Sequence, residues 1–331
     1  MSEGMNRDKC LSIVGLSKHQ FYYQELGVKP GRAPSCTTTW RDPSTGIKYE
    51  VDNRMVVDQI VAIKLDPDHS NWYRMITVNL AIMGYYINHK KVYGLMQSYV
   101  LLEPAKKTKG RNFVQYRRVI PEGPLRILEM DIKYVWIHEA KRYAKVLTII
   151  DTYTRYALHW VVGYAMKSIQ VKEALEYVIA EYLQEAQMLH LDLEVSLRND
   201  NDKVFEAKLI QDFFKANHIH QEFTHPYTPE ENGHIESFHS ILSNALKRDQ
   251  FQNLQSLENR LDVFYTCYNN DRAHSATKGV PPAKFWALYD LGEIEMKIID
   301  KRKVRFELKV AYQDILTINN IDKYKYRRLR A

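Results

Sequence analysis

The segment that decides the fold reads Ile127-Leu128-Glu129-Met130-Asp131-Ile132-Lys133-Tyr134, and its residues alternate between two faces. In an extended chain, Glu129 and Asp131 point to one side, whereas Leu128 and Met130 point to the other. This alternation predicts an amphipathic strand. The change of period from the preceding residues predicts that a new domain begins near Leu125.

Strands and helices follow one another downstream in a pattern typical of an α/β domain. Apolar runs predict further strands over residues 144–151, 157–164, 191–197 and 219–224. Helical spacing predicts helices over residues 168–187, 203–217 and 254–270, and a long helix that ends near Asp249. The short gaps between the first three strands favour an antiparallel meander.

Three carboxylates occupy distinctive places in this order of elements. Asp131 lies on the first strand, Asp200 follows the fourth, and Glu236 lies on the long helix, with 35 residues between the last two. If the first and fourth strands are neighbours, two acids meet and the helix can bring the third. Carboxylate oxygens suit hard cations such as Mg²⁺ or Mn²⁺, which assist phosphodiester cleavage. The alternative is that these acids are solvated surface groups, or that Asp200 caps the helix beginning near Lys203.

The composition is that of an ordinary globular protein. The apolar fraction is 45%, no run approaches the roughly 18 apolar residues of a membrane helix, and the N-terminus has no apolar secretory core. Cys10, Cys36 and Cys267 are scattered without CxxC spacing, which argues against a disulfide framework or a zinc finger. We therefore expect a cytoplasmic protein, associated with the nucleoid when bound to DNA, that has no membrane partner.

Positive charge is concentrated in two places. Residues 297–331 hold 11 Lys and Arg against four acids, which formally accounts for the whole net charge of +7. A second run without acids contains Lys106, Lys107, Lys109 and Arg111. Such runs suit a phosphate backbone. A solvated linker and tail explain the same charges.

The N-terminal third reads as mainly helical. We expect two short helices within residues 1–26, a Pro- and Gly-rich loop over 29–53 and a helix over 54–64. Residues 70–102 predict a helical pair broken at Gly84, with Asn88 as the cap of the second helix. His89, Lys90 and Lys91 stand in its first turn, where a helix-turn-helix reads DNA. A packed helical pair with ordinary surface lysines is the alternative.

Three motifs carry a resemblance to a known family. They are Asp131 on an opening strand, Asn199-Asp200-Asn201 with Phe205 close behind, and Pro226-Tyr227-Thr228-Pro229 followed by Asn232-Gly233-His234-Ile235-Glu236-Ser237-Phe238. The segments 88–96, 268–277 and 281–285 add to the likeness. On these residues, roughly from 70 to 290, the chain resembles the insertion-sequence transposases with a retroviral-integrase-type core, which are DDE recombinases.

The resemblance implies a fold and an activity. The implied fold is α/β: a ribonuclease H-like core with a five-stranded mixed sheet and helices, preceded by a helix-turn-helix region and followed by a small basic tail with β structure. The implied activity is metal-dependent cleavage at element ends and strand transfer into target DNA. Asp131, Asp200 and Glu236 would then hold two Mg²⁺ or Mn²⁺ ions. The implied partners are terminal inverted repeats, target DNA and further copies of the chain in a synaptic complex.

Two residues depart from the family pattern. Asp202 stands where similar proteins usually have glycine, and Ser243 stands where they often place Lys or Arg. Asp202 is therefore an alternative metal ligand or a source of repulsion toward DNA, although only 33 residues separate it from Glu236. Lys247 and Arg248, one turn after Ser243, are the expected DNA contacts on this helix.

The family likeness also suggests DNA contacts around the acids. It places the loop 225–233 against DNA, which makes Tyr227 and Asn232 candidate contacts. Arg272 in the closing segment is a candidate phosphate ligand. The alternatives are a proline-shaped turn for the loop and loop anchoring for Arg272.

We expect five regions along the chain. They are an N-terminal helical region with a loop (1–66), a helix-turn-helix-like DNA-binding region (67–105), a basic linker (106–124), the integrase core and closing segment (125–290), and a basic appendage (291–331). In the appendage, Val304, Phe306 and Leu308 alternate with charged residues and predict a strand. A catalytically dead DNA-binding regulator of the same fold is the alternative function, and a nuclease acting on RNA–DNA hybrids is a third.

Overall fold

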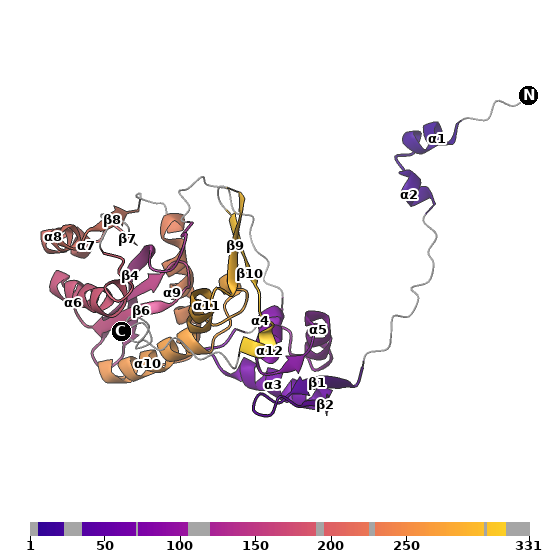
Figure 1. Cartoon of the computed structure of the whole chain (residues 1–331), viewed down its shortest axis with the longest axis horizontal. Coiled ribbons are helices and arrows are strands. Elements are labelled where there is room, and N and C mark those ends of the chain that lie inside the picture. The colour runs from indigo at the N-terminus through magenta and orange to yellow at the C-terminus, as the bar shows by residue number, and fades with distance from the viewer. Residues whose placement is uncertain are drawn as a thin grey trace, which may run out of the picture. The chain divides into compact units, whose positions relative to one another are not determined.

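The computed structural model describes residues 6–22, 35–70, 72–104, 120–189, 195–224, 229–300 and 303–315. The chain divides into two units, Met1–Cys36 and Thr37–Ala331. The described part of the first unit contains helices α1 (Arg7–Ile13) and α2 (Lys18–Phe21) (Figure 1). Ser17 caps α2, and Gln20 completes a capping box. The remaining elements belong to the second unit.

The largest sheet of the second unit has five strands in the order β6-β5-β4-β7-β8. Their bounds are β4 (Ile127–Ile137), β5 (Arg142–Asp151), β6 (Ala157–Gly163), β7 (Val195–Asn199) and β8 (Ile219–Phe223). The first three strands pair antiparallel, whereas β4–β7 and β7–β8 pair parallel. This mixed sheet confirms the predicted ribonuclease H-like core, and it makes the first and fourth strands of that core neighbours.

Helices cover both faces of this sheet (Figure 1). The helices on one face are α6 (Ser168–Val178), continued by the π-helical η1 (Ile179–Leu183), and α7 (Lys203–Glu206) and α8 (Lys208–Ala216). They pack on the β4 face that carries Leu128 and Met130. On the opposite face lie α9 (Gly233–Ala245), which follows the short η2 (Pro229–Asn232), and α10 (Leu254–Asn270). The polar face of β4, with Glu129 and Asp131, therefore faces α9.

A smaller sheet with three helices precedes the core. Its strands, in the order β2-β1-β3, are β1 (Thr37–Arg41), β2 (Lys48–Asp52) and β3 (Tyr85–Tyr86). Its helices α3 (Asn53–Leu65), α4 (Tyr73–Ile82) and α5 (His89–Ser98) share an apolar cluster. The expectation of a loop over 29–53 is wrong for β1 and β2. The Pro and Gly content suggested a loop, but β1 pairs with β3 far along the chain, and local composition does not report such pairing.

The C-terminal part adds a β-hairpin to the core. After η3 (Ser275–Thr277) and α11 (Pro282–Asp290), β9 (Ile294–Asp300) and β10 (Lys303–Leu308) pair antiparallel, and α12 (Tyr312–Ile315) follows. The strand predicted from alternation in the appendage is β10. Phe306 of β10 is buried against Phe285 of α11 and Tyr153. Within the described part of the chain, no helix has both the length and the apolar character needed to cross a bilayer.

Candidate active site

The sheet brings Asp131 and Asp200 together. Asp131 lies on β4, and Asp200 directly follows β7, the parallel neighbour of β4. The Asp131 side chain is 24% exposed, and its Oδ1 accepts a hydrogen bond from the Ile132 amide at 2.7 Å. Burial, together with the negative charges of Asp131 and Asp202, raises the pKa of Asp200. The two carboxylates are thus close enough to repel each other, which a bound cation would relieve.

Glu236 lies on α9, the helix that covers the Asp131 face of β4. Its side chain is exposed in the first turn of the helix. His239, three residues later, is buried, and its Nδ1 lies 3.2 Å from Asp131 Oδ2. Residues three apart share a helix face, so Glu236 lies on the side of α9 that meets Asp131. Among the described residues, however, the three predicted acids do not form a group whose ligand atoms all lie within 4.8 Å of one another.

A buried carboxylate, Glu129, ties α9 to β4. It is completely buried and accepts a hydrogen bond from the Ile235 amide at 2.7 Å. Its other oxygen lies 2.7 Å from Nδ1 of His234. Burial raises the pKa of Glu129 to about 7, although the Ile235 amide and the charges of Arg155 and Arg198 oppose the rise. Glu129 therefore sets where the first turn of α9, and with it Glu236, meets the sheet.

Arg198 provides a second buried tie. Its guanidinium pairs with Glu222 of β8 at 2.6 Å and donates to the Glu231 carbonyl, just before α9, at 2.8 Å. One buried side chain thus links β7, β8 and the entry to α9. Neither Glu129 nor Arg198 is among the site residues predicted from the sequence. For Glu129, one feature of the sequence could have indicated a role in the site: it stands two residues before Asp131, on the same face of the strand.

Asp202 is a helix cap in this structure. Its Oδ1 accepts a hydrogen bond from the Val204 amide at 3.1 Å at the start of α7. Its own amide donates to Asp200 Oδ1 at 3.2 Å. The alternative expectation that Asp200 caps the helix beginning near Lys203 is therefore wrong, because Asp202 is the cap. Asn201 anchors the same loop by donating to the Thr224 carbonyl at 2.9 Å.

The candidate DNA contacts upstream of the core differ in their surroundings. His89 and Lys90 are exposed in the first turn of α5, which Asn88 caps as predicted. Lys91 is less exposed, and its Nζ donates to the Thr37 carbonyl of β1 at 2.5 Å. Lys106, Lys107, Lys109 and Arg111 lie outside the described residues.

The candidate contacts within the core also differ from one another. Lys247 and Arg248 are exposed just after α9. Asn232 is 5% exposed, and Arg272 donates a hydrogen bond to the Asp68 carbonyl. This contact matches the anchoring alternative for Arg272. Tyr227 lies outside the described residues.

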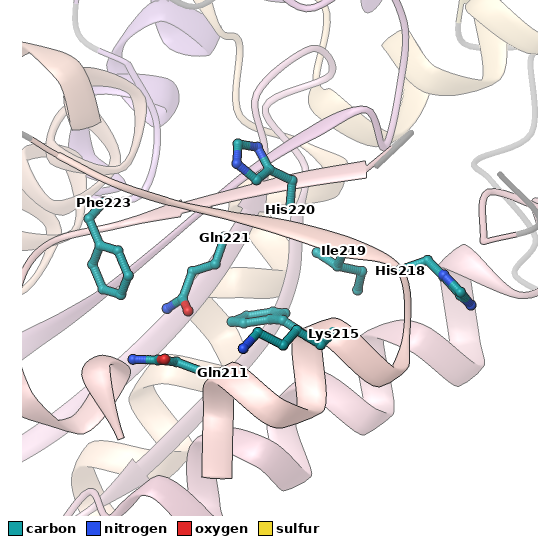
Figure 2. Close-up of a pocket in the computed structure, with 8 residues that line it drawn as sticks. Gln211, Lys215, His218, Ile219, His220, Gln221 and Phe223 are labelled. Atoms are coloured by element: carbon teal, nitrogen blue, oxygen red, sulfur yellow. The ribbon is translucent and has the colours of Figure 1, made fainter. Parts of the chain in front are cut away.

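A groove along the edge strand β8 is separate from the acids. Its lining residues come from α8, β8 and the turn between them, as Figure 2 shows: Gln211, Phe214, Lys215, His218, Ile219, His220, Gln221 and Phe223. None of these residues carries a carboxylate. The groove therefore offers no carboxylate oxygen to a metal ion, and its lining does not include Asp131 or Asp200.

Comparison with protein families identifies the core. The integrase core domain family matches residues 121–229, and a second family of the same description matches residues 217–282. Together these matches run from before β4 to the first residue of α11 and include all three predicted acids.

Known relatives are similar at low identity. The chain is 23% identical over 217 residues to an uncharacterized 31.7 kDa protein of insertion element IS407 from Burkholderia multivorans, covering 65% of this chain and 75% of that protein. It is 22% identical over 225 residues to the putative transposase InsK of IS150 from Escherichia coli, covering 64% and 76%. A chain in a simian T-cell lymphotropic virus intasome is 14% identical with a TM-score of 0.43, covering 61% of this chain and 67% of that one.

Proposed function

Since this chain belongs to the insertion-sequence transposases with an integrase core, we propose that it cuts DNA at the ends of a mobile element and joins those ends to target DNA. The observation that carries the proposal is that Asp131 on β4 and Asp200 directly after β7, the parallel neighbour of β4, form a pair, while Glu129 ties the helix of Glu236 to β4.

The proposed metal ligands are Asp131, Asp200 and Glu236. The donor set consists of carboxylate oxygens, which suit Mg²⁺ or Mn²⁺, and we propose two ions. When bound, the cations supply Lewis-acid stabilisation of the charge that develops on the phosphate oxygens. Asp131 and Asp200 are already close and mutually repelling. Glu236 completes the set by a change of its exposed side chain, while Glu129 keeps the helix in place.

We propose that exposed cations position the DNA. Lys90 on α5, and Lys247 and Arg248 after α9, are exposed and offer charge to phosphates, and His89 is an exposed polar candidate beside Lys90. The proposed arrangement is a DNA-binding region around α4 and α5, a basic linker, the catalytic core and a basic C-terminal appendage. The proposed partners are element ends, target DNA and further copies of the chain, and the proposed location is the cytoplasm.

The test is joining of labelled DNA from the element's ends to a plasmid in the presence of Mg²⁺. Glu236→Gln should retain DNA binding but reduce joining by more than about 100-fold. Replacing a residue that only supports a metal ligand typically costs roughly 10- to 100-fold, so a larger loss indicates a direct ligand. Ser240→Ala, an exposed change on the same helix, is the matched control and should join normally. Equal joining by the wild type and Glu236→Gln would remove Glu236 from the site. DNA binding without any joining by the wild type would favour the regulator.

A further inference from the structure

A second cluster of metal-ligand side chains lies away from the acid pair. Asp66, His69 and Cys267 each offer one ligand atom, and these three atoms all lie within 4.8 Å of one another. Asp66 and His69 belong to the connector between α3 and α4, and Cys267 lies in the last turn of α10. The cluster therefore joins the N-terminal part of the second unit to its catalytic core.

Existing contacts hold two of the three candidate ligands, Asp66 and His69, in place. Asp66 Oδ1 accepts a hydrogen bond from the Asp68 amide at 2.8 Å, whereas its Oδ2 lies 3.6 Å from Nε2 of His69. The His69 side chain is 20% exposed, and its Nδ1 is buried without a hydrogen-bond partner among the described residues. A buried ring nitrogen without a partner costs free energy, which a ligand bound at that nitrogen would recover.

The connector is fixed against α10 by its neighbours. Asp68 is buried, and its carboxylate accepts two hydrogen bonds from Arg260 of α10 at 3.0 and 2.6 Å. Arg272 donates to the Asp68 carbonyl from just beyond the same helix. These contacts hold Asp66 and His69 beside Cys267, so that the ligands do not have to be gathered from a mobile loop.

We propose that Asp66, His69 and Cys267 bind one Zn²⁺ ion that links the α3–α4 connector to α10, with solvent as the fourth ligand. Zinc accepts thiolate, imidazole and carboxylate in a tetrahedral arrangement. Mg²⁺ and Ca²⁺ prefer oxygen ligands alone, so the thiol discriminates against them. Binding forms the Zn–S bond and releases the Cys267 thiol proton to solvent. The alternative is an Asp–His ion pair beside an uninvolved thiol.

The test uses the untagged full-length protein, freed of metal by a chelator and kept reduced. Titrated with Zn²⁺, it should bind about one ion per chain, release protons and unfold at a higher temperature. Co²⁺ in place of Zn²⁺ should give the absorption of a tetrahedral site with a thiolate-to-cobalt charge-transfer band. Bound zinc should also slow alkylation of Cys267, while alkylation of the exposed Cys36 continues.

Variants locate the site. Cys267→Ser and Asp66→Asn should lose the stoichiometric zinc and its effect on thermal unfolding, whereas the control Cys36→Ser should keep both. Glu236→Gln should bind zinc normally, so this proposal and the proposed DNA joining succeed or fail separately. Absence of zinc binding by the wild type, equal binding by Cys267→Ser, or a cobalt spectrum without the thiolate band would each overturn the proposal. The cobalt spectrum needs no variant, so it decides even if Cys267→Ser does not fold.

Discussion

At the scale of single residues, Glu129 makes the stability of the chain depend on pH. Its pKa is raised to about 7 by burial, so the folded chain holds a proton there that the unfolded chain has already released. The free energy of unfolding should therefore fall as the pH rises from about 4.5 to about 7, by at most roughly 3 kcal/mol from this group. Urea unfolding in metal-free buffer across this window measures the fall.

Glu129→Gln isolates this effect. Gln keeps an oxygen for the Ile235 amide but cannot ionise, so the fall in stability with pH should become shallower. Glu173→Gln, an exposed change on α6, should leave the wild-type slope unchanged. A slope that is identical in the wild type and Glu129→Gln would show that another group carries the pH dependence.

Residue type and spacing predicted part of this site. The sequence predicts that Asp131 and Asp200 meet if the first and fourth strands of the core are neighbours, and in the structure these strands are paired. The buried Glu129 and Arg198 could not be assigned in the same way, because their roles depend on contacts with residues 24 to 106 positions away. Spacing also left the role of Asp202 open, because an Asp carboxylate suits both a helix cap and a metal ligand.

At the scale of secondary-structure elements, Asp202 and Asp200 have different roles: Asp202 caps α7, whereas Asp200 is a proposed metal ligand. Asn caps a helix about as well as Asp, so Asp202→Asn should keep both stability and DNA joining. Asp202→Ala should lose about 1 kcal/mol of stability with joining retained in the folded fraction. Asp200→Asn should keep the fold but lose joining, because its carboxylate is the proposed metal ligand. Loss of joining in Asp202→Asn would instead make Asp202 a ligand.

The first turn of α5 provides a second prediction about an element. Lys90 is exposed, whereas Lys91 donates to the Thr37 carbonyl. Lys90→Ala should weaken DNA binding similarly for all sequences and reduce the slope of log affinity against log salt by about 1. Lys91→Ala should change that slope less and lower thermal stability more. Equal salt slopes for Lys90→Ala and the wild type would exclude Lys90 from phosphate contact.

Element prediction succeeded where the pattern was local. The helices after Asn88 and Asn253 begin at caps that stand next to them in the sequence. The predicted helix over 203–217 divides into α7 and α8 at Ala207, because the ψ angle of Ala207 is 136° and its backbone is therefore not helical. Strand β3 has two residues and exists only through its pairing with β1, so periodicity could not reveal it.

At the scale of the whole molecule, the described residues of the C-terminal appendage pack against the rest of the second unit. Ile315 of α12 is completely buried. The neighbouring Gln313 and Asp314 contact the small N-terminal sheet: Gln313 donates to the Tyr85 carbonyl at 3.1 Å, and Arg41 pairs with Asp314 at 2.8 Å. Removing residues 291–331 would expose the apolar cluster around Phe285, so such a deletion cannot test DNA binding alone.

Removing residues 321–331 is the cleaner experiment. This segment contains five Lys and Arg against one acid and lies beyond Ile315. We expect its removal to leave thermal unfolding unchanged while DNA affinity and its salt dependence fall, because each lost phosphate contact lowers the salt slope by about 0.9. A full-length chain with those five cations replaced by Gln should show the same loss of DNA affinity and salt dependence as the truncated chain. This result would show that the charge of the segment, and not its length, contributes to binding. Unchanged affinity and salt slope in both chains would place the basic DNA contacts elsewhere, with Lys90, Lys247 and Arg248 as the remaining described candidates.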